Sequence, residues 1–268
     1  MFKHRIFVKE RRNKMKITII KVEDQARGQF NYGEIMENKP IGFPQDGGRL
    51  KPYSNLFYWA HAWTPGKEST IGEHPHQGFE IMSFVLKGSL EHFDSKHNGW
   101  RKLSEGDAQI IRAGNGITHA EKVNENSEFF QIWVDPGLDK TLNQEASYDD
   151  YPAEAFPIEE KDGMKVRHYA GNNAPMKMDA PGVSIMEIWL REGKHKLQVN
   201  KADINSIYLI EGEIKLNESN MSVSDYAIVE DAGELTLVSS GVSRLFIMKN
   251  PATVNYLTYA QRMRRHFA

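Results

Sequence analysis

Cysteine is absent from the 268-residue sequence, and this absence removes several kinds of chemistry. The chain can form no disulfide, can hold no metal through thiolates and has no cysteine nucleophile. Any metal that it binds must therefore be held by nitrogen and oxygen atoms.

Long apolar runs and an excess of charge of one sign are also missing. No stretch approaches the roughly 18 consecutive apolar residues of a membrane-spanning helix. With Lys+Arg 34 against Asp+Glu 36, the formal charge of −2 gives no general electrostatic reason to bind nucleic acid or an anionic membrane. We expect neither partner.

Signals for secretion, nucleotide binding and serine hydrolysis are lacking as well. The basic segment 1–14 has no continuous apolar core and no small-residue cleavage site, so we interpret it as an N-terminal extension of a cytoplasmic protein. The sequence contains no Walker loop, no GxGxxG after an expected strand and no GxSxG elbow.

What is present is typical of an all-β protein. Short runs rich in Ile, Val, Phe, Tyr and Trp alternate with Gly, Asn, Asp and Pro. The expected strands lie within residues 56–64, 79–88, 89–95, 108–114, 128–135, 183–194, 204–219, 226–233, 234–240 and 244–250. Helical periodicity is weak, and the best helix candidates are the linker described next and the last dozen residues.

A polar linker over residues 136–160, with three prolines, separates two groups of expected strands. We place the domain boundary near residue 145, which gives an N-terminal domain 1–145 and a C-terminal domain 146–268.

The two groups repeat one another. MSFVLKGSLEHFDS (82–95) aligns with SIYLIEGEIKLNES (206–219), which matches Gly88 to Gly212, and two further pairs of segments align in the same order. The repetition predicts one β-domain in two copies, as tandem sandwiches or barrels. Barrels of this kind can enclose a cavity for a small molecule.

Histidines concentrate in the first copy, which holds six of the ten between residues 61 and 119. His74 and His76 are two residues apart, so on an extended strand both point to the same face. His119 and Glu121 repeat this spacing. If the two pairs converge on neighbouring strands, three imidazoles and one carboxylate form a ligand set that suits Fe, Mn, Cu, Ni or Zn and leaves positions open for substrate or dioxygen.

The strings HPHQGFE, GSLEHFDS, GDAQIIRAGNGITHAE and FFQIWVD, in this order, resemble the pirin family of the cupin superfamily. The resemblance covers most of residues 55–152 and implies two tandem cupin domains, each a double-stranded β-helix (jelly roll). It implies one metal in the N-terminal domain, held by His74, His76, His119 and Glu121. Iron(II) is the expected metal, with Mn, Ni, Cu, Co and Zn as alternatives.

Two residues near the first histidine pair, Gln77 and Glu80, need an interpretation of their own. Gln77 stands where the family commonly has arginine, which changes the charge at the rim of the site. Glu80 stands where many other cupins have their carboxylate ligand. Because pirin-like proteins take this ligand from the position of Glu121, we interpret Glu80 as a supporting residue.

The second copy lacks the ligand pattern. Aligned on Gly212, the places of His74 and His76 are taken by Gln198 and Asn200, and the place of His119 falls near Leu237. We therefore expect a C-terminal domain without metal.

Three further histidines receive structural interpretations. His92 is expected at the barrel surface or its mouth, and His195 is expected in solvent. His61 shares a strand face with two tryptophans and is expected in the core or in a pocket wall.

The resemblance implies a metal-dependent dioxygenase that acts on a flavonol such as quercetin, or a similar aromatic substrate, with dioxygen. Glu121 would then be both a ligand and the base that takes the substrate hydroxyl proton. The alternative is a metal-dependent regulator that binds a protein partner and has no physiological turnover. An enclosed dry pocket would favour the enzyme, and a shallow open site would favour the regulator.

Overall fold

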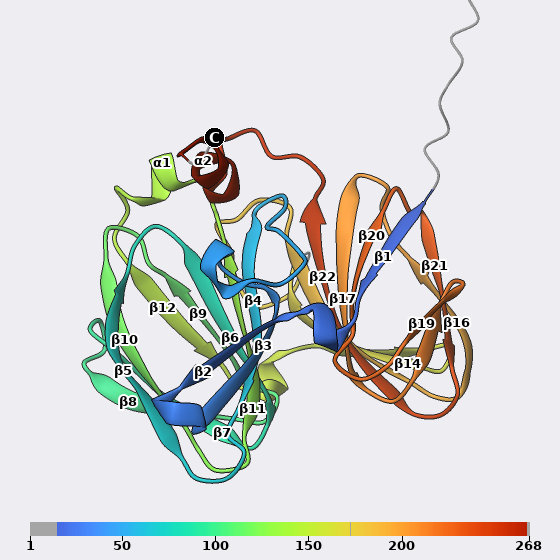
Figure 1. The fold of residues 1–268 in the computed structure, drawn as a ribbon, viewed down its shortest axis with the longest axis horizontal. Coiled ribbons are helices and arrows are strands. Elements are labelled where there is room, and N and C mark those ends of the chain that lie inside the picture. Colours follow the sequence, from blue (N-terminus) through green and yellow to red (C-terminus); the bar gives the residue numbers. More distant parts are fainter. Residues whose placement is uncertain (1–14, 172, 267–268) are drawn as a thin grey trace, which may run out of the picture.

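The computed structural model describes residues 15–171 and 173–266, so the predicted extension 1–14 lies outside the described residues. Strands dominate the described chain, and they form two units that lie side by side (Figure 1). The all-β prediction is therefore confirmed.

Each unit pairs a seven-stranded sheet with a four-stranded sheet. The larger N-terminal sheet contains, in spatial order, β12 (Ser147–Tyr151), β9 (Ala108–Arg112), β6 (Glu80–Lys87), β11 (Glu128–Val134), β4 (Leu56–Trp63), β3 (Ile35–Ile41) and β2 (Ala26–Phe30). The smaller one contains β5 (Ser69–His76), β10 (Ile117–Val123), β7 (Ser89–Asp94) and β8 (Gly99–Ser104).

The C-terminal unit repeats this arrangement. Its larger sheet contains β1 (Lys16–Ile20), β20 (Tyr226–Glu230), β17 (Asp203–Glu211), β22 (Ser243–Pro251), β15 (Ser184–Leu190), β14 (Met164–Ala170) and β13 (Ile158–Lys161). Its smaller sheet contains β16 (Gly193–Gln198), β21 (Glu234–Ser239), β18 (Ile214–Leu216) and β19 (Ser219–Met221). Strands β4 to β11 thus recur in the same spatial order as β15 to β22, as the predicted duplication requires.

The matched glycines end equivalent strands and do so for the same reason. Gly88 follows β6 with φ 71°, and Gly212 lies at the equivalent place after β17 with φ 82°. A Cβ atom at either position would lie 2.3 Å from a serine hydroxyl, that of Ser127 or that of Ser243. Both turns therefore require glycine.

The outermost strands cross between the units. β12 follows residue 145 but pairs with β9 of the N-terminal unit, and β1 begins the described chain but pairs with β20 of the C-terminal unit. The boundary near residue 145 stays a prediction, and by sheet membership the N-terminal unit extends to Tyr151.

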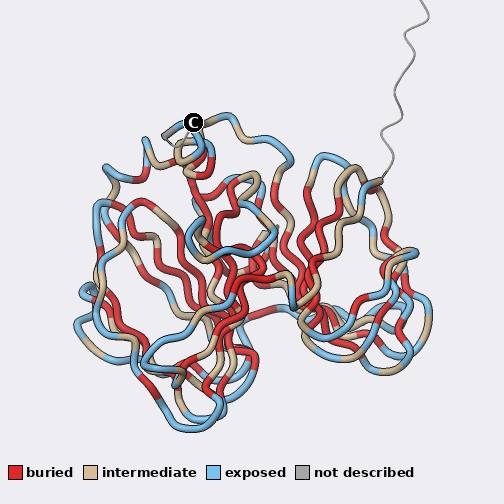
Figure 2. Tube along the Cα trace, viewed as in Figure 1, coloured by how far each residue is buried: buried red, intermediate tan, exposed pale blue. Residues whose placement is uncertain are grey.

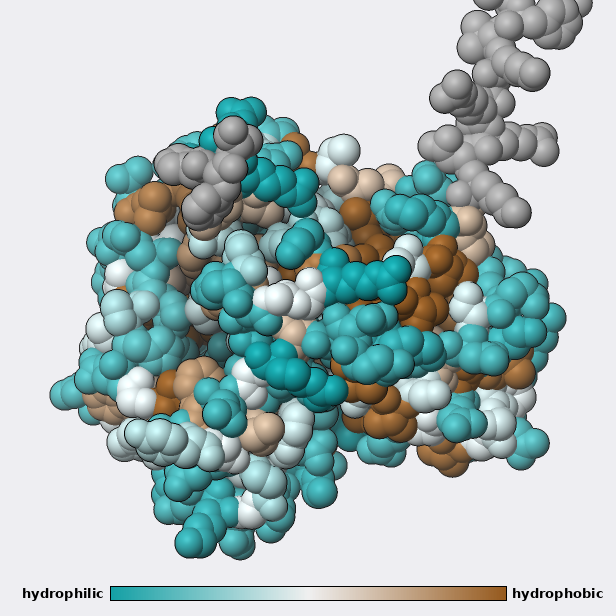
Figure 3. All heavy atoms as spheres, in the orientation of Figure 1, coloured by the Kyte–Doolittle hydropathy of each residue, from teal (hydrophilic) through white to brown (hydrophobic). Residues whose placement is uncertain are grey.

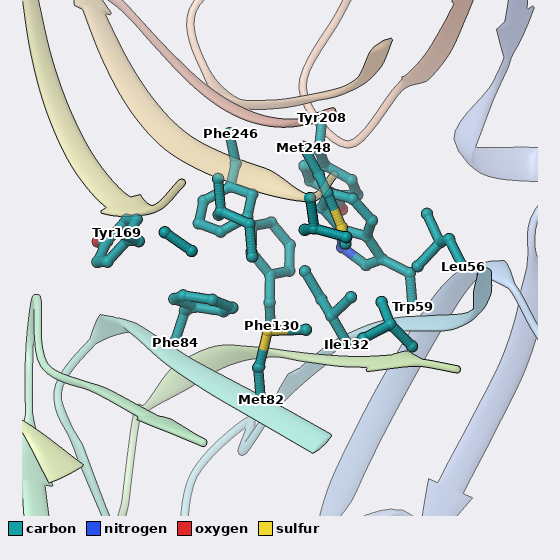
Figure 4. Close-up of a cluster of buried hydrophobic side chains, with 14 of the residues drawn as sticks. Leu56, Trp59, Met82, Phe84, Phe130, Ile132, Tyr169, Tyr208, Phe246 and Met248 are labelled. Carbon is teal, nitrogen blue, oxygen red and sulfur yellow. The ribbon is translucent and has the colours of Figure 1, made fainter. Parts of the chain in front are cut away.

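The two large sheets share one hydrophobic core. Trp59 and Phe130 from the N-terminal unit meet Tyr208 and Phe246 from the C-terminal unit, and all four side chains are buried (Figure 4). Buried chain accordingly runs through the middle of the molecule, between the units (Figure 2). The shared core fixes the units against one another.

Short helices lie outside the sheets, as predicted for the linker and the last dozen residues. They are η1 (Val22–Asp24), η2 (Asn31–Gly33), η3 (Pro44–Asp46), α1 (Leu138–Thr141), η4 (Ala153–Ala155) and α2 (Tyr259–His266). α1 and α2 lie together at one end of the N-terminal unit (Figure 1).

Polar side chains cover much of the face seen in Figure 3, and apolar ones gather over the C-terminal unit near β1 and β20. Among residues 15–171 and 173–266, no helix has the length and apolar character needed to cross a membrane.

Candidate metal centre

Three histidines from two paired strands meet inside the N-terminal unit. β5 supplies His74 and His76, and β10 supplies His119, which lies opposite His74 in the antiparallel register. One ring nitrogen from each residue lies within 4.8 Å of the others. The Nε2 atoms of His74 and His119 are 2.9 Å apart.

Neighbouring groups orient these rings. Nδ1 of His74 lies 2.8 Å from the carbonyl oxygen of Gly72. Because a carbonyl only accepts, this Nδ1 carries a proton, and the bond leaves Nε2 facing His119. Nε2 of His76 is buried and has no hydrogen-bond partner, which leaves it available to a ligand.

Burial keeps the imidazoles of His76 and His119 neutral. It lowers the pKa of His76 to about 4, and the nearby ring of His74 adds to this effect. Burial and the surrounding imidazoles also lower the pKa of His119. Since metal binding needs the unprotonated nitrogen, both rings are ready to bind at neutral pH.

Glu121 approaches the same site from β10. The pairing of β10 with β5 shifts register between His119 and Glu121, and such a bulge redirects the side chains beside it. The buried carboxylate accepts a hydrogen bond of 2.7 Å from Nε2 of Gln131, whose Oε1 accepts one of 3.1 Å from Nε1 of Trp133. Gln131 therefore fixes the orientation of Glu121.

The charge state of Glu121 depends on its surroundings. Burial raises the pKa of Glu121 to about 7, and the nearby carboxylate of Glu37 raises it further. A cation beside this carboxylate would hold it ionised.

The donor set fits a divalent metal ion. Metal–nitrogen distances of about 2.1 Å place ligand nitrogens roughly 3 to 4 Å apart, which is compatible with the spacing of the three rings. The nitrogen without a partner on His76 is one of these three donors, and the buried carboxylate of Glu121, which lies outside the group of three, would be the fourth. The full set of four ligands stays a prediction.

A cavity of about 350 Å³ opens onto these residues. Aromatic and aliphatic side chains form most of its wall. Its lining residues are Phe30, Glu37, Phe43, Tyr58, Ile71, Gly72, His74, His76, Glu121, Phe129, Gln131 and Trp133. The ring of Trp133 packs edge to face on His76 with centroids 4.8 Å apart, so the apolar wall reaches the histidines.

Glu37 is a second carboxylate of this cavity that the sequence did not reveal. It lies on β3, is buried, and accepts a hydrogen bond of 3.2 Å from the hydroxyl of Tyr58. Nζ of Lys39 lies 3.6 Å from Glu37 and 2.9 Å from Asp46, so one cation serves two carboxylates. Burial raises the pKa of Glu37. No spacing in the segment around Glu37 resembles a site, and only the pairing of β3 with β4 brings it here.

Two of the histidine interpretations are wrong. His92 is not at the surface but fully buried behind His119, with its Nε2 2.8 Å from Nδ1 of His119. His195 is 6% exposed, and its ring nitrogens bond the carbonyl oxygens of Asp162 and Arg191. Both rings lie on the inner face of short strands, where polar sequence had suggested solvent.

His61, Glu80 and Gln77 lie around the site without entering it. His61 packs at the junction of the units, 3.1 Å from the hydroxyl of Tyr208. Glu80 is buried in another cavity and accepts the backbone N–H groups of Asp179 and Ala180 at 2.6 and 2.9 Å. The exposed Gln77 donates to the carbonyl oxygen of Asn115 at 3.0 Å.

The equivalent place in the C-terminal unit is apolar. Two residues after the matched glycines, Leu90 pairs with Val123 and Ile214 pairs with Ser239. Counting back from these pairs, Leu235 and Leu237 take the places of His119 and Glu121, and both leucines are fully buried.

The strand register corrects the predicted alignment of the first histidine pair. Leu197 pairs with Leu235 as His74 pairs with His119, so Leu197 and Val199, and not Gln198 and Asn200, take the places of His74 and His76. The side chains of Gln198 and Asn200 form other hydrogen bonds. Nε2 of the exposed Gln198 donates to Glu234 at 2.7 Å, and Oδ1 of Asn200 accepts the backbone N–H of Ala202 at 2.9 Å. Among the described residues, the group of three or more His, Asp or Glu side chains close enough to share a metal is that of His74, His76 and His119 in the N-terminal unit.

Known proteins resemble this chain in sequence and in fold. Residues 29–134 match the family model named Pirin. A Zymomonas mobilis protein named "Putative quercetin 2,3-dioxygenase" is 35% identical over 147 residues, which cover 43% of this chain and 60% of that protein. The matched stretch thus spans less than two thirds of this relative.

Solved structures share the fold over most of the chain. A bacterial pirin from Escherichia coli in complex with nickel(II) superposes with a TM-score of 0.73 at 21% identity, covering 89% of this chain and 100% of that one. A quercetin 2,3-dioxygenase from Acinetobacter baumannii gives a TM-score of 0.74 at 20% identity, covering 93% and 94%. These likenesses confirm the predicted bicupin fold.

Proposed function

The chain carries a pirin domain of the cupin superfamily over residues 29–134, and from this premise we propose that it is a metal-dependent dioxygenase of the quercetin 2,3-dioxygenase type. One observation supports the proposal: two imidazoles of the three-histidine group, His74 and His76, line a cavity together with the carboxylate of Glu121, and the other walls of this cavity are mostly apolar. Such a cavity offers a metal and a dry place for an organic substrate at the same point.

The walls of the cavity favour a flat aromatic substrate. Phe43, Tyr58 and Trp133 pack against one another with ring centroids 4.9 to 5.6 Å apart and form one side of it. Flat rings stack well on such a surface. Glu37 adds a hydrogen-bond acceptor away from the histidines, so a ligand with several hydroxyl groups, such as a flavonol, matches both features.

Residues His74, His76, His119 and Glu121 would hold the metal, which supplies Lewis acidity toward a substrate hydroxyl and redox chemistry with dioxygen. Glu121 is placed to take the hydroxyl proton, because its carboxylate lines the cavity beside His74 and His76 and would be ionised next to the metal. Gln131 keeps the carboxylate in position through its bond of 2.7 Å. The apolar wall excludes water from the reacting atoms.

Iron(II) is the metal we propose, with manganese, nickel, copper, cobalt and zinc as alternatives, because three nitrogens and one carboxylate do not select among them. The compartment that we propose is the cytoplasm. Neither choice alters the roles of the four side chains.

Dioxygen uptake with quercetin tests the proposal. We expect metal-depleted protein to consume no dioxygen and protein reconstituted with iron(II) to consume it only when quercetin is present. Glu121→Gln should lower the turnover rate about 10²- to 10⁴-fold, the usual contribution of a positioned acid–base group. The matched control is Gln198→Ala, which changes an exposed amide of the other unit.

The regulatory alternative makes a different prediction for the same samples. A metal-dependent binding protein would take up metal with the same four side chains but would show no dioxygen uptake with any flavonol. The volume of about 350 Å³ and the mostly apolar lining of the cavity favour a small molecule over a protein surface. Absence of uptake in fully metal-loaded protein would therefore reject the enzyme and favour the regulator.

A further inference from the structure

Behind the metal-facing side of His119 lies a second buried imidazole, that of His92 on β7. Nε2 of His92 is 2.8 Å from Nδ1 of His119, and neither residue is exposed. The ring of Tyr148 stacks on His92 with an interplanar angle of 12° and a centroid distance of 5.2 Å. His92 is therefore held in one plane, with one edge toward His119.

The opposite edge of His92 faces a carboxylate. Nδ1 of His92 lies 4.0 Å from Oδ2 of Asp94, and both atoms are buried without any hydrogen-bond partner. Oδ1 of Asp94 is occupied, because it accepts the backbone N–H groups of Lys96 and His97 at 2.7 and 2.9 Å. Unpaired polar atoms in the interior are costly, so these two have a reason to pair with each other.

Only one placement of the protons on His119 and His92, next to Asp94, leaves Nε2 of His119 able to bind metal. If Nε2 of His119 offers its lone pair, Nδ1 must carry the proton and donate it to Nε2 of His92. His92 then accepts at Nε2 and must carry its own proton on Nδ1, facing Asp94. A carboxylate can only accept, so Asp94 selects this arrangement at every step.

We propose that His92 and Asp94 are positioning residues that fix the tautomer and orientation of His119 for metal binding. Nothing in the family match or in the names of the relatives assigns them this role. The inference rests on the proposed metal centre, but the tautomer that it predicts is a property of the metal-free protein. Outer hydrogen-bond partners of metal-bound histidines typically change metal affinity 10- to 100-fold.

Asp94→Asn gives the sharpest test, because it changes few atoms. Its Oδ1 can keep both backbone N–H groups, which turns the amide N–H₂ toward Nδ1 of His92 and forces the opposite tautomer through the chain. We expect Co(II) affinity, measured by competition with a chelator, to fall about 10- to 100-fold. His92→Phe should show a similar loss, and His92→Gln, which can both accept and donate, should recover part of it.

The matched control is His97→Gln. The ring of His97 packs edge to face on Tyr148 with centroids 4.8 Å apart, but the residue is exposed. The variant keeps the backbone N–H that bonds Asp94. Co(II) affinity should be unchanged. Thermal unfolding of each metal-free variant shows whether its fold is intact.

Ring-nitrogen NMR shifts of metal-free protein report the tautomer directly. We expect His119 to carry its proton on Nδ1 in the wild type and on Nε2 in Asp94→Asn. Unchanged shifts together with wild-type Co(II) affinity in Asp94→Asn would overturn the proposal. If the wild type binds no Co(II), the metal centre fails, and the ring-nitrogen shifts still decide whether Asp94 sets the tautomer.

Discussion

The two units of this chain have the same strands in the same order but different interiors. In the N-terminal unit the small sheet turns His74, His119 and His92 inward, together with the buried carboxylates of Asp94 and Glu121. In the C-terminal unit the corresponding interior is a cluster of aliphatic side chains that includes Leu235 and Leu237. The strand order and the glycine turns are common to both units and determine the fold. The inward residues of one small sheet differ and provide the candidate metal ligands.

The difference has an energetic side. Polar groups buried without water must find partners or they destabilise the fold by several kcal/mol, about 1–3 for each group by mutational measures. The N-terminal interior leaves Nε2 of His76, Nδ1 of His92 and Oδ2 of Asp94 without partners. An interior of this kind is less stable than its aliphatic counterpart and is retained for what it binds.

The largest expected effect is the loss of metal from the N-terminal unit. His74→Gln combined with His76→Gln removes two of the three imidazoles, and we expect metal content to fall from about one ion per chain to none. Gln198→Ala combined with Asn200→Ala changes two exposed amides of the other unit and should leave the content unchanged. Elemental analysis of protein purified without chelator measures both.

The shared core gives the next largest effect. The ring of Trp59 is fully buried, and its centroid lies 5.2 Å from that of Tyr226 and 5.7 Å from that of Phe246, both in the other unit. Trp59→Ala should lower the free energy of unfolding by about 3–5 kcal/mol, the usual cost of removing a large core aromatic. Urea denaturation measures this, and Trp59→Phe should cost less.

Because Trp59 contacts both large sheets, Trp59→Ala should weaken both units together. Hydrogen exchange in the variant should rise in β22 as well as in β11. Faster exchange confined to β11 would show that the two units unfold independently and that the shared core does not couple them.

Much of this fold and part of its site follow from local sequence signals. The alternation in the β6 segment, the matched glycines and the two pairs spaced two residues apart are all visible along the chain. Even the burial of His92 had a signal, because His92 and Asp94 share the strand face of the buried Leu90. This alternation predicts a buried His92, whereas the polar character of the segment favours the surface.

Long-range pairing could not be predicted in this way. The pairing of β1 with β20 joins residues about two hundred positions apart, and no local pattern specifies it. Glu37 enters the cavity only because β3 adds to the edge of β4. When the packing of distant strands determines where a residue lies, no local spacing in the sequence reveals that position.

A smaller effect concerns pH and the buried Glu80, whose equivalent in the C-terminal unit, counted from the matched glycines, is Ile204. Burial raises the pKa of Glu80 from 4.5 to about 7. Since the folded state then holds its proton more tightly than the unfolded state, the stabilising contribution is full below pH 4.5 and is lost as pH rises through 7. At about 1.4 kcal/mol per pKa unit, the loss amounts to at most about 3 kcal/mol.

Glu80→Gln removes this titration. We expect the difference in unfolding free energy between wild type and variant, measured in urea on metal-free protein, to change between pH 4.5 and 7 and to be flat outside that window. Glu121 titrates in both proteins and cancels in the difference. A difference that is constant across the window would show that Glu80 is ionised in the folded state throughout.

The smallest expected effect sharpens the contrast between the units most. Leu197→His combined with Val199→His would place a histidine pair at the equivalents of His74 and His76 in the C-terminal unit, yet we expect no additional metal to bind. The pair would face Leu235 and Leu237 where the other unit has His119 and Glu121, so two donors would be missing. Two imidazoles without further donors form only a weak site, and titration with Co(II) should therefore still saturate at about one ion per chain. A second tight equivalent would mean that the histidine pair alone determines where metal binds, and that the inward histidine and carboxylate of β10 are dispensable.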